Sequence, residues 1–153
     1  MIIIGCDHTG HELKNKIKEY LTNNNIQYLD VCNNANIDNT DDYPDIAELI
    51  CKEVLRNENN YGIAICGTGI GISIASNKIK NIRASVINNP YLAEISRKHN
   101  DLNVLCLGAR EDYVKDIQNL ENIINKFINT KFEGQRHKKR IEKINKLESK
   151  YGN

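Results

Sequence analysis

The sequence lacks a long apolar run, an excess of either charge and a paired cysteine motif. Its apolar stretches are a few residues each, far short of the roughly 20 residues that a membrane-spanning helix needs. Met1 leads into apolar residues without a basic segment, so neither a transmembrane helix nor a secretory signal is expected. Lys and Arg number 21 against 20 Asp and Glu, a net charge of +1 that gives no general electrostatic reason to bind nucleic acid or an anionic membrane.

The five cysteines form an odd, widely spaced set without a C-x-x-C pair. Disulfide frameworks need an even number, and zinc sites need closely spaced ligands, so the set predicts neither a disulfide framework nor a metal site. A reducing cytoplasm is the expected compartment. Cys32 and Cys51 are interpreted as small buried apolar residues.

Length and composition fit one globular domain over residues 1–153. The 153 residues are 40% hydrophobic and 27% charged, which is typical of a globular chain and of neither a disordered nor a fibrous one. No linker, internal repeat or low-complexity tail points to a second domain.

Short β-branched runs alternate with segments of helical period. The expected strands are 1–6, 26–31, 61–66, 82–87 and 103–107. A helix is expected after each strand: the first begins at a capping box of Thr9 and Glu12, the third begins inside 67–71, and the fifth spans 112–129 with Ile117 facing inward.

A βα unit repeated five times, with short connections, requires parallel pairing and right-handed crossovers. The predicted fold is therefore an α/β protein with a three-layer, Rossmann-like, doubly wound sheet of five parallel strands in the order 2-1-3-4-5. Ligands bind such sheets beyond the carboxyl ends of the strands where the order reverses. This switch point brings Asp7 and His8 beside Cys66, Gly67 and Thr68.

The most informative segment is 63–73, where an apolar strand ends in Cys66 and turns through three glycines into a helix. Such a turn exposes backbone N–H groups that bind an anion, here from Gly67 to Gly71 with Gly69 and Ile70 between them. The segment is neither a Walker A loop nor a G-x-G-x-x-G fingerprint after the first strand, which disfavours a nucleotide as the ligand.

Cys66 lies at the meeting point of the strand end and the glycine turn, an environment that favours a thiolate. We therefore expect it to act as a base or a nucleophile. Thr68 faces the same crevice, where its hydroxyl can donate to a substrate oxygen. Asp7 and His8 can polarise a ligand hydroxyl or meet a phosphate, and a loop-capping role is equally compatible with their position.

Two further groups have a functional and a structural interpretation. His99, with Asn100, closes the fourth helix, where it can serve as an acid and base or as a partner of the helix dipole. Arg110 follows the fifth strand, and Arg136 and Arg140 are four residues apart on one helical face, so the three can clamp a phosphate or form a solvated surface. A phosphorylated small molecule is the favoured ligand.

The terminal helix 136–151 has an apolar stripe and no strand to cover. Packing on a partner subunit is the favoured interpretation, and packing across its own domain is the alternative.

These motifs together resemble the ribose-5-phosphate isomerase type B family over nearly the whole length. The resemblance rests on 5–8 (GCDH), 42–45 (DYPD), 65–73 (ICGTGIGIS), 77–78 (NK), 82–84 (IRA), 99–101 (HND), 103–105 (NVL) and 132–134 (FEG), with Arg136, His137 and Arg140. Gln135 stands where that family usually has glycine.

The resemblance implies an isomerase that interconverts ribose 5-phosphate and ribulose 5-phosphate without a metal or cofactor, in a homodimer whose active sites use both subunits; two dimers can pair further. By this resemblance Cys66 moves the proton, and the amides of 67–71 hold the enediolate. His99 opens the sugar ring with Thr68, and Asn100 and Asp7 hold hydroxyls. The phosphate end comprises His8, Arg110, Arg136 and Arg140.

Two alternatives remain open at this level. A galactose-6-phosphate isomerase subunit shares the same fold and chemistry and acts on a six-carbon substrate. A noncatalytic sugar-phosphate sensor keeps the anion-binding turn and the arginines but needs neither Cys66 nor His99.

Overall fold

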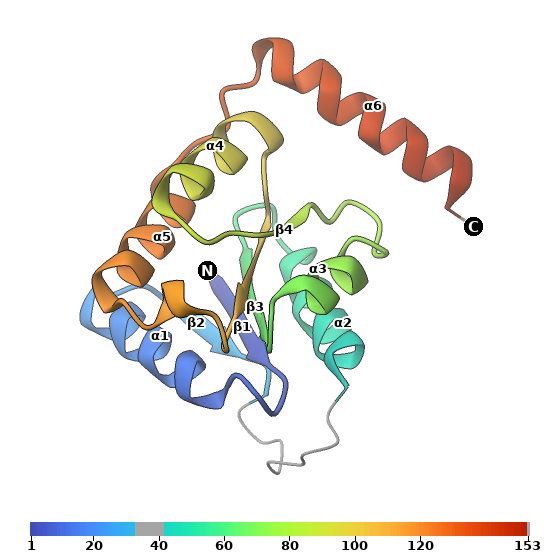
Figure 1. Cartoon of the computed structure of the whole chain (residues 1–153). Coiled ribbons are helices and arrows are strands. Elements are labelled where there is room, and N and C mark those ends of the chain that lie inside the picture. The colour runs from blue at the N-terminus through green and yellow to red at the C-terminus, as the bar shows by residue number, and fades with distance from the viewer. Residues whose placement is uncertain (33–41, 153) are drawn as a thin grey trace.

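The computed structural model describes residues 1–32 and 42–152, so the asparagine-rich segment 33–41 lies outside the described residues. Five parallel strands form one sheet, and helices cover both of its faces (Figure 1). The strands are β1 (Ile2–Cys6), β2 (Tyr28–Asp30), β3 (Tyr61–Cys66), β4 (Ala84–Val86) and β5 (Val104–Gly108). The helices are α1 (His11–Asn23), α2 (Tyr43–Val54), α3 (Ile70–Ser76), α4 (Pro90–Asn100), α5 (Ile117–Asn129) and α6 (Gln135–Tyr151), with a 3₁₀ turn η1 (Asp112–Val114).

Alternation along the strands divides the core into two layers. Ile63 and Ile65 of β3 pack with α1, α4 and α5, whereas Ala64 and Cys66 pack with α2 and α3. Phe127 of α5 is fully buried in the first layer. The sulfur of Cys66 therefore leaves the sheet on the α2–α3 face, where the chain turns into α3.

The expected strand order was wrong at one edge of the sheet. The order is β2-β1-β3-β5-β4, so β5 lies between β3 and β4. All five residues of β5 are buried, whereas the three residues of β4 are partly exposed. A short, half-exposed strand is tolerated at an edge, and a fully apolar strand is stabilised by neighbours on both sides. The β1–β3 switch point is unaffected, because Cys6 pairs with Ile65.

Two helix predictions were also wrong. α1 has no side-chain cap, because its N-cap residue is Gly10 and not Thr9; the hydroxyl of Thr9 donates to Asp7. The expected helix 112–129 is divided into η1 and α5, with Asp116 capping α5 through the amides of residues 118 and 119. This break leaves Ile117 about half exposed, at 51%, rather than facing inward.

Helix α6 projects away from the sheet (Figure 1). Its first turn is anchored by the buried His137, and near its end Glu148 accepts a hydrogen bond from the amide of Asn81 at 3.1 Å. A groove of about 680 Å³ lies between these two contacts and is lined in part by Ile82, Leu102 and Ile144. Among the described residues, no helix has both the length and the apolarity that a bilayer crossing requires.

Candidate active site

The sulfur of Cys66 lies at the carboxyl end of β3 inside the glycine turn. It accepts a hydrogen bond from the amide of Gly69 at 3.2 Å, and the residue is 4% exposed. Gly69 has φ of 77°, a left-handed conformation that glycine adopts at little cost. A Cβ at this position would lie 3.1 Å from the carbonyl carbon of Leu107, so the sequence needs glycine here to bring the amide to the sulfur.

Further donors of the turn remain available for a ligand. Within the described part of the chain, the amides of Thr68 and Gly71 have no hydrogen-bond acceptor. The amide of Ile70 donates to the hydroxyl oxygen of Thr68 at 3.3 Å, which leaves the hydroxyl proton of this exposed residue free to donate. α3 has only seven residues, so the directed amides matter more than the helix dipole.

Three of the residues expected at this edge do gather here. The guanidinium of Arg110 lies over the turn, with Nη1 3.4 Å from the position of a Cβ on Gly67. Asp7 follows β1 and is 5% exposed; its carboxylate accepts from the amide and the hydroxyl of Thr9 at 2.9 and 2.6 Å, which fixes its orientation. His8 comes next in the chain and is exposed.

Three of the other cysteines of the core are unsuited to acid–base chemistry at neutral pH. Burial raises the pKa of Cys6 to about 12 and that of Cys51 to about 11, and it raises the pKa of Cys106 further. These thiols therefore stay protonated. Cys66 is the cysteine whose sulfur accepts a hydrogen bond from the glycine turn.

The remaining expected residues lie in a second cluster at the opposite edge of the sheet. His99 and Asn100 end α4, and Arg136 and Arg140 belong to the first turns of α6. The chain after α4 pairs with the start of β3, because the amide of Gly62 donates to the carbonyl of residue 103 at 2.8 Å. β3 then runs five residue steps to Cys66, about 16 Å at about 3.3 Å per residue. Within one chain the two clusters are therefore separated by the height of the sheet.

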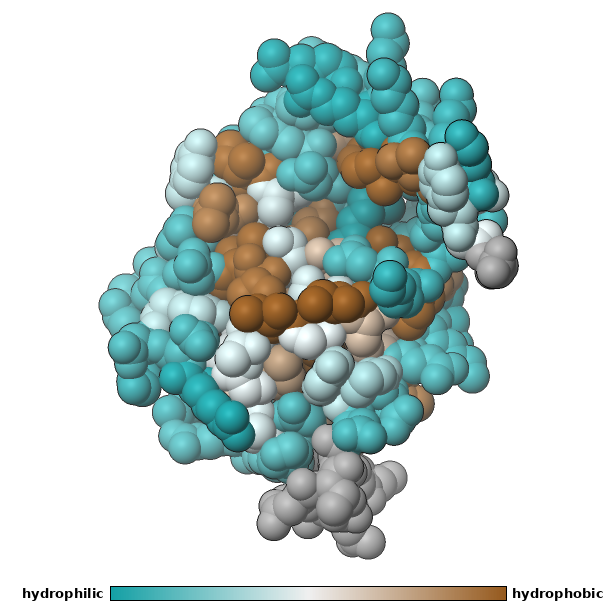
Figure 2. Space-filling view, turned by 45° about the vertical axis from the view of Figure 1, so that its right-hand side comes forward, coloured by the Kyte–Doolittle hydropathy of each residue, from teal (hydrophilic) through white to brown (hydrophobic). Residues whose placement is uncertain are grey.

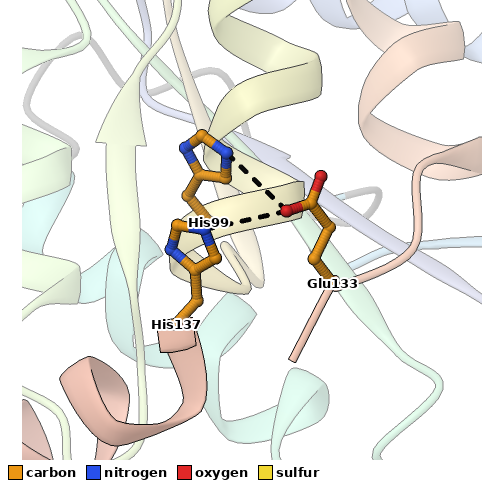
Figure 3. Close-up of side chains that lie close together, drawn as sticks. All are labelled: His99, Glu133 and His137. Carbon is orange, nitrogen blue, oxygen red and sulfur yellow. Dashed lines mark ion pairs between the residues drawn. The ribbon is translucent and has the colours of Figure 1, made fainter. Parts of the chain in front are cut away.

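Two residues to which the sequence assigned no role complete this second cluster (Figure 3). The imidazole of His137 stacks on that of His99 with centroids 4.1 Å apart and planes inclined by 7°. One carboxylate oxygen of Glu133 lies 3.9 Å from Nε2 of His99 and 3.7 Å from Nε2 of His137. The spacing of four residues between Glu133 and His137 was the available signal, but it gives no indication that His99 lies beside them.

The geometry of His99, Glu133 and His137 does not fit a metal ion. An ion shared by two stacked rings whose centroids are 4.1 Å apart would lie about 2 Å out of each ring plane, as far as a whole zinc–nitrogen bond. Arg136 Nε and Arg140 Nη1 also lie 3.3 Å from the two ring nitrogens of His137, and their charges oppose a cation. The trio is better suited to proton transfer and anion binding.

A doubly wound parallel sheet with a cysteine and directed amides at its switch point defines a Rossmann-like enzyme of small-molecule chemistry. The chain belongs to the Ribose/Galactose Isomerase family, whose sequence profile matches residues 2–144.

Named relatives match almost the entire chain. Ribose-5-phosphate isomerase B of Escherichia coli is 39% identical over 149 residues, which are 97% of both chains. The structure of the Clostridium thermocellum ribose-5-phosphate isomerase B superimposes with a TM-score of 0.87 at 40% identity, covering 98% of both chains. The Mycoplasma genitalium ribose-5-phosphate isomerase B, solved with bound ribulose 5-phosphate, gives a TM-score of 0.87 at 39% identity, covering 97% of this chain and 95% of that one.

Proposed function

We propose that the protein is an aldose–ketose isomerase that interconverts ribose 5-phosphate and ribulose 5-phosphate through an enediolate. The observation that carries the proposal is the sulfur of Cys66 held 3.2 Å from the amide of Gly69, beside amides that no described residue occupies. A base next to preorganised donors is what proton transfer between adjacent sugar carbons requires. The named relatives, and the ketose bound to one of them, support this substrate.

The chemistry needs only groups that the chain supplies. The thiolate of Cys66 takes the proton from C2 of the open-chain aldose, and the C2–H electrons form the C1–C2 double bond while the carbonyl electrons move to the oxygen. The amides from Gly67 to Gly71 stabilise that oxyanion; in other enzymes one such donor contributes about 2.7–4 kcal/mol. The proton of the C2 hydroxyl then moves to the oxygen on C1, the electrons left on the C2 oxygen form the C2 carbonyl, and the double-bond electrons take the proton back from Cys66 at C1, which gives the ketose.

The other roles follow the two clusters. Thr68 and Asp7 hold sugar oxygens beside Cys66, and His8 and Arg110 meet the phosphate at that edge. His99 opens the furanose ring, Asn100 holds a hydroxyl, and Arg136 and Arg140 bind phosphate. Binding the unreactive phosphate orients the sugar, so that Cys66 meets the correct carbon.

One substrate cannot touch both clusters of the same chain, so we infer a homodimer whose sites combine the Cys66 edge of one subunit with the His99 edge of its partner. Exposed apolar residues support such packing: Ile70 and Ile74 on α3, Leu92 on α4 and Leu147 on α6. Figure 2 shows apolar surface gathered on the face below the projecting helix. The groove beneath α6 provides space for a partner segment. Two such dimers pairing into a tetramer is a further step of the same proposal.

We propose a cytoplasmic location, because Cys6, Cys51, Cys66 and Cys106 are free thiols.

A coupled assay of the purified protein with ribose 5-phosphate, allose 6-phosphate and galactose 6-phosphate tests the activity and its substrate. Turnover is expected with ribose 5-phosphate; preference for galactose 6-phosphate would identify the six-carbon alternative, and saturable binding without ketose formation would identify a sensor.

The two clusters predict different kinetic defects. Cys66→Ala is expected to abolish isomerisation while phosphate binding persists, because the turn and the arginines remain. Arg136→Ala is expected mainly to raise KM, because it removes a phosphate contact far from the carbon acid. Normal turnover by Cys66→Ala would remove Cys66 from the mechanism.

A further inference from the structure

We propose that Glu133 and His137 are positioning residues for His99: Glu133 holds the Nε2 edge of the imidazole, His137 fixes the plane of the ring, and Nδ1 is left as the atom that moves the proton. The inference rests on the proposed function, because it gives the ring-opening step a defined geometry. All three side chains belong to one chain and are within the described residues (Figure 3).

The tautomer of His99 follows from its surroundings. Which ring nitrogen carries the proton is set by the group that faces the other nitrogen. The carboxylate of Glu133 faces Nε2 at 3.9 Å, so it favours the proton on Nε2 and the lone pair on Nδ1. Such contacts are often long before substrate binds and tighten in the complex. A carboxylate at this place also stabilises the imidazolium that forms when Nδ1 accepts a proton.

The stacked ring of His137 fixes the plane of His99 without competing for the proton. His137 is 2% exposed. Burial lowers its pKa, and the neighbouring His99, Arg136 and Arg140 lower it further. His137 is therefore neutral near pH 7, so a transient charge on His99 meets a neutral aromatic face and not a second cation.

The backbone between Glu133 and His137 is strained, and its conformation places both side chains beside His99. Gln135 has φ of 43°, a left-handed conformation that is unfavourable for a residue with a side chain, and it follows Gly134 with φ of 67°. The amide of Glu133 donates to the carbonyl of Lys98 at 3.1 Å, which holds the segment against the last turn of α4. The turn thereby brings Glu133 and His137 to the same histidine, and strain of this kind is kept where the surrounding structure depends on it.

The ring-opening step moves one proton from one sugar oxygen to another. Nδ1 of His99 takes the proton of the anomeric hydroxyl, and the O–H electrons form the C1 carbonyl. The bond from C1 to the ring oxygen breaks, its electrons stay on that oxygen, and the imidazolium returns the proton there. Glu133 is the charged group beside Nε2 of His99, and Lys98 precedes His99 on α4. Arg136 and Arg140 contact the neutral His137 that stacks on His99.

The test uses Glu133→Gln and His137→Phe, with Glu58→Gln on an exposed turn as the control for the same change of charge. Phe keeps a flat ring but loses both nitrogens. For Glu133→Gln we expect kcat with ribose 5-phosphate to fall about ten- to a hundredfold at nearly unchanged KM, because the residue acts on proton transfer and not on phosphate. His137→Phe should lower kcat less, because a stacked ring remains.

A second measurement separates positioning from general damage. In deuterium oxide, ribulose 5-phosphate gains deuterium at C1 when Cys66 forms the enediolate and the proton on its sulfur exchanges with the solvent, and this exchange does not require ring closure. We expect the ratio of deuterium incorporation to aldose formation to rise in Glu133→Gln and to stay at the wild-type value in Glu58→Gln.

Unchanged kcat and an unchanged exchange ratio in Glu133→Gln would overturn the positioning role. So would a parallel loss of both reactions with a raised KM, which would mean that Glu133 acts through the phosphate. Wild-type protein that neither exchanges nor isomerises would overturn the proposed function, and this inference with it.

Discussion

Mixing two inactive variants tests the arrangement of the site across subunits. Cys66→Ala removes the proposed base at the carboxyl edge of the sheet, and His99→Asn removes the proposed ring-opening group at the amino edge. Because about 16 Å of strand separates these edges in one chain, each substrate must use Cys66 of one subunit and His99 of the other. A mixed dimer then contains one site with both defects and one site with neither.

The size of the recovery follows from this geometry. When equal amounts of the two variants exchange subunits freely, about half of the dimers are mixed, and each has one intact site of its two. About a quarter of the wild-type activity should therefore return. If Cys66 and His99 of the same chain formed the site, every site in the mixture would carry a defect, and no activity would return.

The two variants are given different affinity tags and are refolded together, and dimers carrying both tags are purified and assayed with ribose 5-phosphate. These purified mixed dimers should have about half of the wild-type activity, because one of their two sites is intact. A matched control mixes His99→Asn with Arg136→Ala, which both lie in the second cluster. Every mixed dimer of that pair has a defect in each site, so activity below KM should not exceed the mean of the parents. Failure of the Cys66 and His99 pair to recover activity in dimers that carry both tags would refute the shared site.

Two further substitutions test local structure. Gly69→Ala should destabilise the protein by about 2 kcal/mol in urea unfolding, because alanine is strained at φ of 77° and its Cβ meets the backbone of residues 107 and 108. The substitution should also lower kcat, because the displaced amide no longer donates to Cys66. Burial pushes the pKa of Asp30 up, but hydrogen bonds from Lys18, Lys14 and an amide outweigh it and hold that pKa below its ordinary value. The stabilisation is therefore present above the ordinary carboxyl pKa of about 3.9 and is lost as the pH falls through the lower folded-state pKa. Asp30→Asn should lower the free energy of unfolding by about 3–5 kcal/mol at pH 7, since it leaves the buried Lys14 uncompensated. The difference from wild type should shrink below about pH 4. A difference independent of pH would contradict this reasoning.

The part of the site around Cys66 could be predicted from the sequence because local rules determine it. An apolar run ending in cysteine and followed by spaced glycines fixes where β3 ends, and the reversal of strand order between β1 and β3 places Asp7 beside it. Neither inference depends on the far edge of the sheet. The same reasoning failed for β4 and β5, because it assumed that consecutive strands are neighbours. The useful signal was composition: 104–107 is entirely apolar, whereas 82–87 includes Arg83 and Ser85.

The capping box failed because Gly10, and not Thr9, takes the N-cap position, while the side chain of Thr9 bonds to Asp7. Thr9 and Glu12 have the right spacing, but the carboxylate of Asp7 lies two residues before Thr9 and accepts from its amide and its hydroxyl. A hydrogen bond to a charged carboxylate is stronger than one between neutral groups, so Thr9 stays bonded to Asp7. The same contact orders the carboxylate of Asp7 at the end of β1.

The position of His99 follows from topology more firmly than from any motif. In a parallel sheet each helix runs back from the carboxyl edge to the amino edge, so a residue in the last turn of such a helix lies where the next strand begins. His99 is in the last turn of α4 and Cys66 is the last residue of β3. If both act on one sugar, no rearrangement of loops within a single chain can bring them together, because the sheet itself keeps them apart. The chemistry then requires two chains to associate. Arg136 and Arg140 on α6 lie on the same side as His99, which is where the Cys66 edge of a partner subunit would have to bind.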